Sequence, residues 1–138
     1  MRIRYCWRCD RHMPMLSASE LRLCEEARRD GATVVQREAR ARGVRDFAGV
    51  GELNRVTEFR RMRPFLDMYK LLTGFEETNP NAIWHHLDDL YGPDCPACGK
   101  PLRTPKARYC AACGFGKEDL VSPDTKPLAE RRPELFQR

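Results

Sequence analysis

The sequence contains no apolar run approaching the roughly 18 residues that a membrane-spanning helix needs. Its first residues also lack the apolar stretch of a secretory signal peptide. We therefore expect a cytoplasmic protein that has no membrane partner. In that reducing compartment disulfides are rare, so the seven cysteines of the chain are expected to act as metal ligands or as buried thiols.

Several signatures of enzymes are also missing. The chain has no glycine-rich phosphate-binding loop, no G-x-S-x-G nucleophile motif and no H-E-x-x-H zinc-protease motif. The zinc deaminase pattern is not met either, because Asp94 rather than a proline precedes Cys95 and no H-x-E sequence occurs. His85 with Asp88 or Asp89 could form an acid/base pair at helical spacing, but these carboxylates are more typical of a solvated acidic face. We expect no catalytic activity.

A chain of 138 residues and 16.0 kDa is long enough for one modest domain with an appendage. Hydrophobic residues make up 41% of it and charged residues 33%, which is typical of a folded protein rather than a disordered one. The formal net charge is +5, but residues 64–99 hold one basic and six acidic side chains, whereas residues 100–138 hold nine basic and five acidic ones. This balance permits binding to a polyanion without identifying a site for it.

Capping signals and apolar periodicity predict helices in the first third of the chain. Ser17 or Ser19 can cap a helix, with Glu20 bonding back to the cap. We expect this helix to stop at Gly31, because glycine is a common helix terminator, and a second helix to cover residues 32–42. A glycine-containing loop should follow.

That loop is expected over residues 44–51, and the strongest helical pattern begins after it. From Glu52 to Leu72 an apolar residue recurs every three or four positions, the period of a helix buried along one face. Pro64 lies inside this pattern and is expected to kink or break the helix near Arg63. A last helix is predicted to follow the cap residue Asn79, from Pro80 or Asn81 to Tyr91, and to carry His85 and His86.

Two C-x2-C motifs in the second half of the chain are the strongest chemical signal. Each turn lets two thiolates reach one ion, and the glycine after each second cysteine permits the backbone to fold over the site. Residues 101–104 and 107–109 between the motifs have the length of two hairpin strands, with Pro105 at the bend. The motifs predict one closed zinc site with four thiolate ligands, namely Cys95, Cys98, Cys110 and Cys113.

Residues 95–114, CPACGKPLRTPKARYCAACG, resemble the zinc-ribbon family. The resemblance implies a structural Zn²⁺ ion, and iron in a rubredoxin-like site is the alternative that the motif leaves open. Four cysteine ligands leave no position for water, so we expect the metal to act on folding rather than on hydrolysis.

Cys6 and Cys9 form a third C-x2-C motif at the N-terminus. Two thiolates do not complete the coordination of zinc, so the other ligands of a second site would come from elsewhere in the chain. The candidates are His12, Cys24, His85 and His86. Adjacent histidines on a helix point about 100° apart, so we expect only one of His85 and His86 to join the cysteines. The alternative is that Cys6 and Cys9 are reduced core thiols packed by Trp7 and that hydrogen bonds satisfy the histidines.

The predicted fold is mainly α: a small helical bundle of four or five helices with a C-terminal zinc-ribbon β-hairpin and an N-terminal cysteine knuckle. Three parts are expected along the chain. They are a helical domain with the knuckle, the zinc ribbon and an extended tail, at residues 1–93, 94–115 and 116–138.

The opening CWRC, the segment LTGFEETNPNAIWHH and the ribbon are together similar to small bacterial zinc-ribbon proteins. That resemblance carries no activity, and it implies a protein partner of the kind that immunity proteins or adaptors have. We therefore expect a zinc-binding, non-catalytic protein-interaction module. Its partner would contact the acidic segment 76–94 or the basic hairpin 100–109.

A nucleic-acid-binding regulator is the alternative function. Four basic side chains cluster beside Tyr109 in the predicted hairpin, where they could contact phosphates while the tyrosine stacks on a base. These basic residues are Lys100, Arg103, Lys106 and Arg108.

Overall fold

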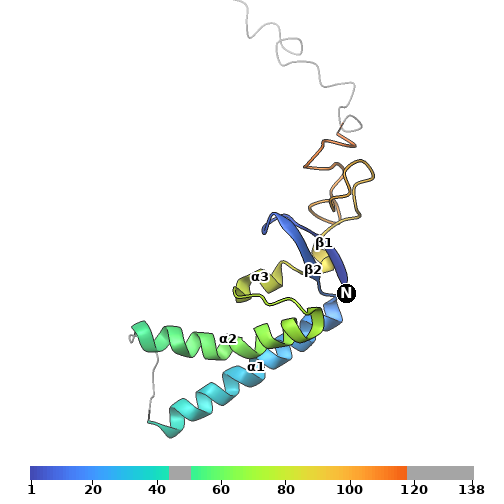
Figure 1. Cartoon of the computed structure of the whole chain (residues 1–138). Helices are drawn as coiled ribbons and strands as arrows, with labels where there is room; N and C mark the ends of the chain where they lie inside the picture. The colour runs from blue at the N-terminus through green and yellow to red at the C-terminus, as the bar shows by residue number, and fades with distance from the viewer. Residues whose placement is uncertain (44–50, 118–138) are drawn as a thin grey trace, which may run out of the picture. The chain divides into compact units, whose positions relative to one another are not determined.

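The computed structural model describes residues 1–43 and 51–117, with the side chains of the helix that starts at Gly51 described from Glu58 on. The chain divides into two compact units, Met1–Tyr91 and Gly92–Arg138. All helices and strands of the described residues belong to the first unit (Figure 1). In chain order they are β1 (Arg2–Cys6), β2 (Arg11–Met15), α1 (Ala18–Ala41), α2 (Gly51–Thr73), α3 (Pro80–Trp84) and the short 3-10 helix η1 (Asp88–Leu90).

The N-terminal cysteine knuckle is the turn of a β-hairpin. β1 and β2 pair antiparallel from Arg2 opposite Met15 to Cys6 opposite Arg11. The last three residues of each strand are buried, and Cys6 packs with Met13 and Met15 in a small apolar cluster. The sequence predicts only a small non-helical segment here, and the structure resolves it into two strands.

Helix α1 begins as the sequence predicts. Ser17 is its N-cap: the backbone N–H of Glu20 donates to the Ser17 hydroxyl oxygen (3.3 Å), and the Ser17 N–H donates to the Glu20 carboxylate (2.8 Å). The prediction that this helix stops at Gly31 is wrong, because α1 continues to Ala41. A Cβ atom at Gly31 would lie 2.5 Å from Cγ of Pro64 in α2. The glycine therefore allows close packing of the two helices rather than ending one of them.

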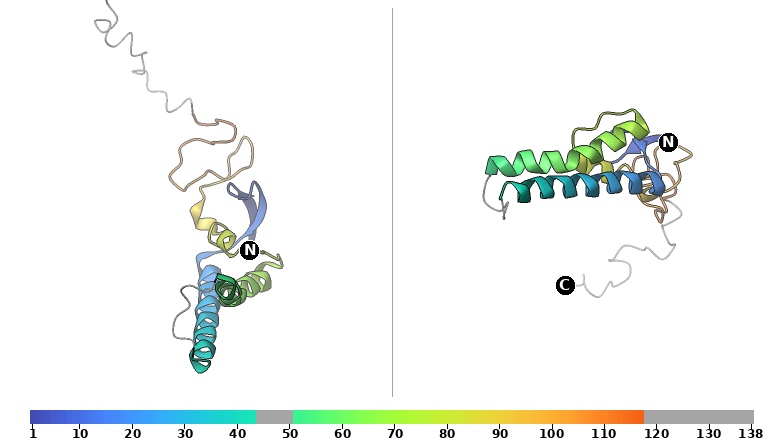
Figure 2. Two further views of the ribbon diagram at one scale, coloured as in Figure 1. Left: turned by 90° about the vertical axis from the view of Figure 1, so that its left-hand side faces the viewer. Right: turned by 90° about the horizontal axis from the view of Figure 1, so that it is seen from below.

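Helix α2 runs through Pro64 without interruption, so the predicted break near Arg63 does not occur. Figure 2 shows the ribbon changing direction part-way along α2, which agrees with the bend that an internal proline produces. α1 and α2 lie side by side as an antiparallel pair (Figure 1, Figure 2). The loop predicted for residues 44–51 lies outside the described residues, except that Gly51 already belongs to α2. Among the described helices, none combines the length and the apolar character that a bilayer crossing requires.

Helix α3 starts at its predicted cap but is shorter than predicted. The side-chain oxygen of Asn79 accepts a hydrogen bond from the Asn81 N–H (3.0 Å). The helix ends at Trp84, and the predicted continuation to Tyr91 is wrong, because the following backbone pairs with Leu16 just after β2. The described residues thus contain three α-helices and one 3-10 helix, instead of the four or five helices predicted, and the first unit is mainly α as expected.

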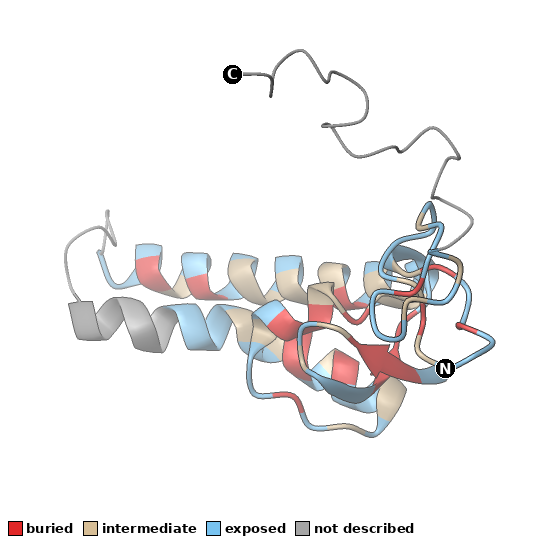
Figure 3. Cartoon of the chain, turned by 90° about the horizontal axis from the view of Figure 1, so that it is seen from above, coloured by how far each residue is buried: buried red, intermediate tan, exposed pale blue. Residues whose placement is uncertain are grey.

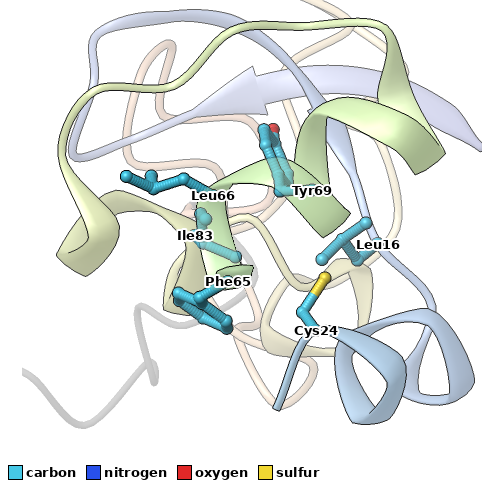
Figure 4. Close-up of a cluster of buried hydrophobic side chains, with 6 residues drawn as sticks. All are labelled: Leu16, Cys24, Phe65, Leu66, Tyr69 and Ile83. Carbon is cyan, nitrogen blue, oxygen red and sulfur yellow. The ribbon is translucent and has the colours of Figure 1, made fainter. Parts of the chain in front are cut away.

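The main hydrophobic core lies where the first half of α1 meets the second half of α2 and α3 (Figure 4). Its fully or nearly buried members are Leu16, Cys24, Phe65, Leu66, Tyr69 and Ile83. Figure 3 shows that burial concentrates around the hairpin and the helix ends next to it, while much of the surface of α1 is exposed. The core therefore supports the side of the first unit on which the knuckle lies.

The second unit is described up to Lys117. Two C-x2-C turns and one isolated antiparallel bridge, between Asp94 and Pro101, organise its backbone. No strand forms within this described part, so the hairpin predicted between the two motifs is not confirmed. Most of the predicted tail, residues 116–138, lies outside the described residues.

We expect Gly31→Ala to destabilise the protein by about 1–3 kcal/mol, because the new Cβ would overlap the Pro64 ring in a packed interface. Helix propensity alone predicts the opposite sign, since alanine is favoured over glycine by about 1 kcal/mol in a helix interior. Urea unfolding measures the difference. In a Pro64→Ala background, which removes the ring, the same change should be neutral or stabilising. A loss of stability there as large as in the wild type would contradict the packing explanation.

Candidate metal centres

Eight of the described residues form two groups that could each hold a metal ion. Within each group the ligand atoms all lie within 4.8 Å of one another. The group of the first unit consists of Cys6, Cys9, His85 and His86, and the group of the second unit consists of Cys95, Cys98, Cys110 and Cys113. We call them the first and the second metal centre. All eight residues are among the candidate ligands that the sequence offers.

The three C-x2-C turns share one backbone geometry. In each, the N–H of the residue after the second cysteine donates to the carbonyl oxygen of the first cysteine. The donor–acceptor pairs are Asp10–Cys6 (2.9 Å), Gly99–Cys95 (2.8 Å) and Gly114–Cys110 (2.9 Å). The bond closes the turn and lets both thiols of a motif reach one ion. The N-terminal motif is thus a knuckle of the same kind as the two C-terminal ones.

The residue after the second cysteine has a positive φ in all three turns. This angle is 73° at Gly99, 80° at Gly114 and 54° at Asp10. Glycine adopts this left-handed conformation freely, whereas most other residues are strained in it and aspartate tolerates it better than most. The Tyr5 hydroxyl donates a hydrogen bond to the Asp10 carboxylate and helps to hold the turn. A sequence rule that requires glycine at this position would overlook the N-terminal knuckle.

The four sulfur atoms of the second centre have the spacing of ligands to a single ion. Sγ of Cys95 lies 3.7 Å from Sγ of Cys113, and Sγ of Cys98 lies 3.6 Å from Sγ of Cys110. Tetrahedral zinc with Zn–S bonds of about 2.3 Å places neighbouring sulfurs roughly 3.8 Å apart. A disulfide would require an S–S distance of about 2.05 Å, and all seven cysteines are free thiols. The spacing therefore fits a four-thiolate metal site.

The pKa shifts in the second centre differ between its thiols. Although backbone N–H groups also donate to Cys98 and Cys113, desolvation and the neighbouring thiols raise the pKa of both. For Cys110 the backbone N–H groups prevail and favour the thiolate form. Those of Cys113 and Ala112 lower the pKa of Cys110 to about 7, so this ligand loses its proton near neutral pH. Cys95 and Cys110 are buried, whereas Cys98 and Cys113 are exposed. One cysteine of each motif thus anchors the site and the other faces the surface.

Both histidines join the two cysteines in the first centre. Nε2 of His86 is 3.2 Å from Sγ of Cys9, and Nδ1 of His85 is 3.4 Å from Sγ of Cys6 and 3.8 Å from Sγ of Cys9. The prediction that only one histidine would reach the cysteines is wrong. It assumed that both stand on a helix, whereas α3 ends at Trp84 and the two imidazole rings meet edge to face with centroids 5.1 Å apart.

Burial favours the neutral form of both imidazoles in the first centre, which is the form that binds metals. His86 is fully buried, and burial together with the His85 ring lowers the pKa of His86 to about 4. Burial also lowers the pKa of His85. Burial and a hydrogen bond with Cys6 raise the pKa of Cys9 to about 11, so a bound cation would be needed to hold Cys9 in the thiolate form near neutral pH.

The two other candidate ligands lie outside both centres. His12 is on the exposed part of β2, with its ring centroid 5.7 Å from that of Tyr5. Cys24 is fully buried in the main core, and burial raises the pKa of its thiol to about 11. Cys24 is therefore a packed core thiol, the more common role of a cysteine on a helix face.

A short backbone bridge positions the histidines against the knuckle. The Leu16 N–H donates to the His86 carbonyl (2.7 Å), and the Asp88 N–H donates to the Leu16 carbonyl (2.9 Å). The guanidinium of Arg4, a buried residue of β1, donates to the Asp88 carboxylate (2.7 Å). This ion pair engages Asp88, which the sequence suggested as an acid/base partner of His85. The sequence does not indicate the roles of Leu16 and Arg4 at this bridge. A contact between single residues that are far apart in the chain produces no periodic pattern in the sequence.

No protein-family model, curated protein or solved structure matches the chain. The resemblance of residues 95–114 to the zinc-ribbon family therefore stays a prediction. The case for metal binding depends on the donor atoms, their spacing and the shared knuckle geometry.

Asp10→Ala should destabilise the metal-loaded protein by about 1 kcal/mol more than Asp10→Gly. Both variants lose the hydrogen bond from Tyr5, so the difference between them isolates the effect of the positive φ at this position. Thermal unfolding of the two variants measures the difference, and Tyr5→Phe shows the effect of the hydrogen bond alone. Equal stabilities of the alanine and glycine variants would contradict the knuckle geometry.

Proposed function

We propose that the chain is a zinc-binding, non-catalytic interaction protein in which two zinc ions hold the two units in their folded form. The observation that carries this proposal is that each centre supplies four ligand atoms, all within 4.8 Å of one another. Four cysteines, and two cysteines with two histidines, are both ligand sets of structural zinc. Such sites are closed, so the ion contributes to folding and offers no vacant position to a substrate.

Zinc suits both centres better than iron does. The pair of imidazoles in the first centre, together with two thiolates, is a zinc-type set. Four thiolates can bind either zinc or iron, but the exposure of Cys98 and Cys113 opens the second centre to water. The reduction potential of an iron–sulfur site depends on its solvent exposure and on the hydrogen bonds to its sulfur atoms. Structural zinc is not redox-active, so its site needs no control of solvent exposure.

Two of the hollows on the described surface are smaller than a typical substrate site. Two hollows lined by described residues have volumes of about 120 Å³ and about 190 Å³. Small-molecule sites are larger, on the order of 300–1,000 Å³. The first hollow lies beside Phe59 and Lys70 and the second beside Asp88 and Asp89, and neither includes a metal ligand. We therefore propose no enzymatic role for the two centres.

The acidic segment 76–94 is less available to a partner than its sequence suggests. Glu76 forms an ion pair with Lys70 (3.2 Å). Glu77 is almost buried and accepts two backbone N–H groups, at 2.9 and 3.0 Å. Asp88 accepts a hydrogen bond from a buried arginine. Three carboxylates of the segment 76–94 therefore make contacts within the first unit itself.

Exposed apolar side chains on the two long helices are the better candidates for a protein-binding surface. Leu23 and Val34 of α1 and Phe59 and Leu71 of α2 are between 45% and 77% exposed. Leu23 and Val34 are eleven residues apart, which is about three helical turns, so they lie on one face of α1. Burial of such side chains against a protein partner would remove apolar surface from water.

The charge of the second unit favours a second candidate function. Residues 92–117 carry five basic side chains and a single acidic one, Asp94. Tyr109 and Phe115 are 43% and 50% exposed, and the hydrogen bond from the Cys110 N–H to the Phe115 carbonyl (2.9 Å) brings both aromatic residues to one knuckle. Cations that contact phosphates, together with exposed rings that stack on bases, are typical of surfaces for single-stranded nucleic acid.

Native mass spectrometry of the purified chain should show two zinc ions per molecule, because each centre holds one. Cys9→Ser and Cys98→Ser should each lose one ion. His12→Ala is the matched control and should keep both, because His12 lies in the same hairpin as Cys9 but outside the centre. A metal-free but folded wild-type chain would contradict the proposal, as would a Cys9→Ser protein that still binds two ions.

The two kinds of partner are distinguished by variants of different units. A protein partner should co-purify with the wild-type chain, resist nuclease treatment and be lost with Phe59→Ser and Leu71→Ser, which remove exposed apolar contacts. A single-stranded oligonucleotide should instead bind more weakly as salt rises, and Lys106→Gln and Arg108→Gln should each reduce the slope of log K against log salt by about 0.7–1. Failure of both tests would contradict the proposal of an interaction protein.

A further inference from the structure

Tyr69 contacts the first metal centre from the side of the main core. Its hydroxyl oxygen lies 3.1 Å from Nδ1 of His86 and 2.8 Å from the carbonyl oxygen of Pro14, and the whole residue is buried. On the other side of the same imidazole, Nε2 is 3.2 Å from Sγ of Cys9. The two ring nitrogens of His86 therefore have different partners, since one faces an oxygen atom and the other faces the centre.

The protons available to these groups permit one arrangement. A carbonyl oxygen can only accept, so the Tyr69 hydroxyl donates its single proton to Pro14. The hydroxyl oxygen then accepts a hydrogen bond from His86, which requires that the proton of the neutral imidazole be on Nδ1. Nε2 consequently carries the free lone pair that a metal ion requires.

We propose that Tyr69 is a positioning residue of the first metal centre, which fixes His86 in the Nδ1-protonated form and so presents Nε2 to the ion. This inference rests on the proposed zinc binding at that centre. An outer hydrogen bond of this kind sets the tautomer and orientation of a metal-binding histidine and raises its basicity. Here the Tyr69 hydroxyl accepts a hydrogen bond from the imidazole and donates one to a backbone carbonyl of the hairpin.

Tyr69 is held firmly enough for this role. It lies near the end of α2 and packs in the main core with Leu16 and Phe65. Figure 4 shows its hydroxyl oxygen directed away from the other labelled side chains of that core. The centroids of the Tyr69 and His86 rings are 5.8 Å apart, and Pro14 belongs to β2 of the knuckle hairpin. One buried hydroxyl thus joins α2, the hairpin and a metal ligand.

Tyr91 provides a matched comparison at the same centre. Its hydroxyl donates to the backbone carbonyl of His85 (2.8 Å) and lies 3.5 Å from Sγ of Cys6. Its partners at the centre are a carbonyl and a sulfur rather than an imidazole nitrogen. Loss of the Tyr91 hydroxyl should therefore leave the tautomer of His86 unchanged, whereas loss of the Tyr69 hydroxyl should not.

The test compares Tyr69→Phe and Tyr91→Phe with the wild-type full chain, with zinc as the metal. Competition with a chromophoric chelator should show that Tyr69→Phe weakens the affinity for one of the two zinc ions 10–100-fold and leaves the other unchanged. Long-range ¹H–¹⁵N spectra of the wild type should show a protonated Nδ1 and a metal-bound Nε2 at His86. This pattern should persist in Tyr91→Phe and change in Tyr69→Phe.

Unchanged affinity for both zinc ions in a folded Tyr69→Phe protein would overturn the inference. A wild-type spectrum in which Nε2 of His86 carries the proton would also overturn it, and this measurement needs no variant to fold. A wild-type chain that binds one zinc ion and leaves Cys6 and Cys9 reactive to a thiol reagent would instead contradict the proposed function. The failure of the inference and the failure of the proposed function are therefore distinguishable.

Discussion

The first unit depends on a closure between its two ends, made where Leu16 pairs with the backbone of His86 and Asp88. Cys6 and His85 are 79 positions apart in the chain, and closing so long a loop has an entropic cost that contacts at the closure must offset. Two backbone hydrogen bonds, the Arg4–Asp88 ion pair and the packing of Leu16 in the main core all act at this point. A metal ion bound by ligands from both ends would stabilise the same closure. The first centre therefore lies at the contact that closes the first unit.

The sequence predicts which residues come together in the two centres better than it predicts the architecture. Ligand identity depends on local spacing, so the C-x2-C motifs indicate both centres, and the capping box at Ser17 is likewise local. The errors arise where contacts distant in sequence override a local signal. Glycine commonly ends a helix, so Gly31 predicts a helix end. Helix α1 nevertheless continues through Gly31, because Pro64 of α2 packs against this glycine. The helix predicted to carry His85 ends early, because backbone pairing with Leu16 competes with it.

The pair of histidines illustrates how one such error affects the prediction of a site. On a continuous helix His85 and His86 would point about 100° apart, and only one could face the knuckle. Outside the helix they present different ring atoms to the centre, since Nδ1 of His85 and Nε2 of His86 face the cysteines. The contact between Tyr69 and His86 could not be predicted from the sequence. The position of a tyrosine on the buried face of α2 does not indicate that its hydroxyl meets a histidine later in the chain.

Under the proposed function, the two units differ in how far their folds depend on metal. The first unit has its own apolar core, which Tyr69 connects to the first centre, so metal adds to a packing that already exists. In the described part of the second unit the buried side chains are those of Cys95, Cys110 and Pro101, so the metal ligands themselves make up most of the core. A segment such as the described residues 92–117, with so little buried apolar surface, would need a bound metal to fold. Under the proposed function, the exposed aromatic and basic residues of the second unit therefore depend directly on its zinc ion, whereas the apolar helix surface of the first unit is supported by packing as well.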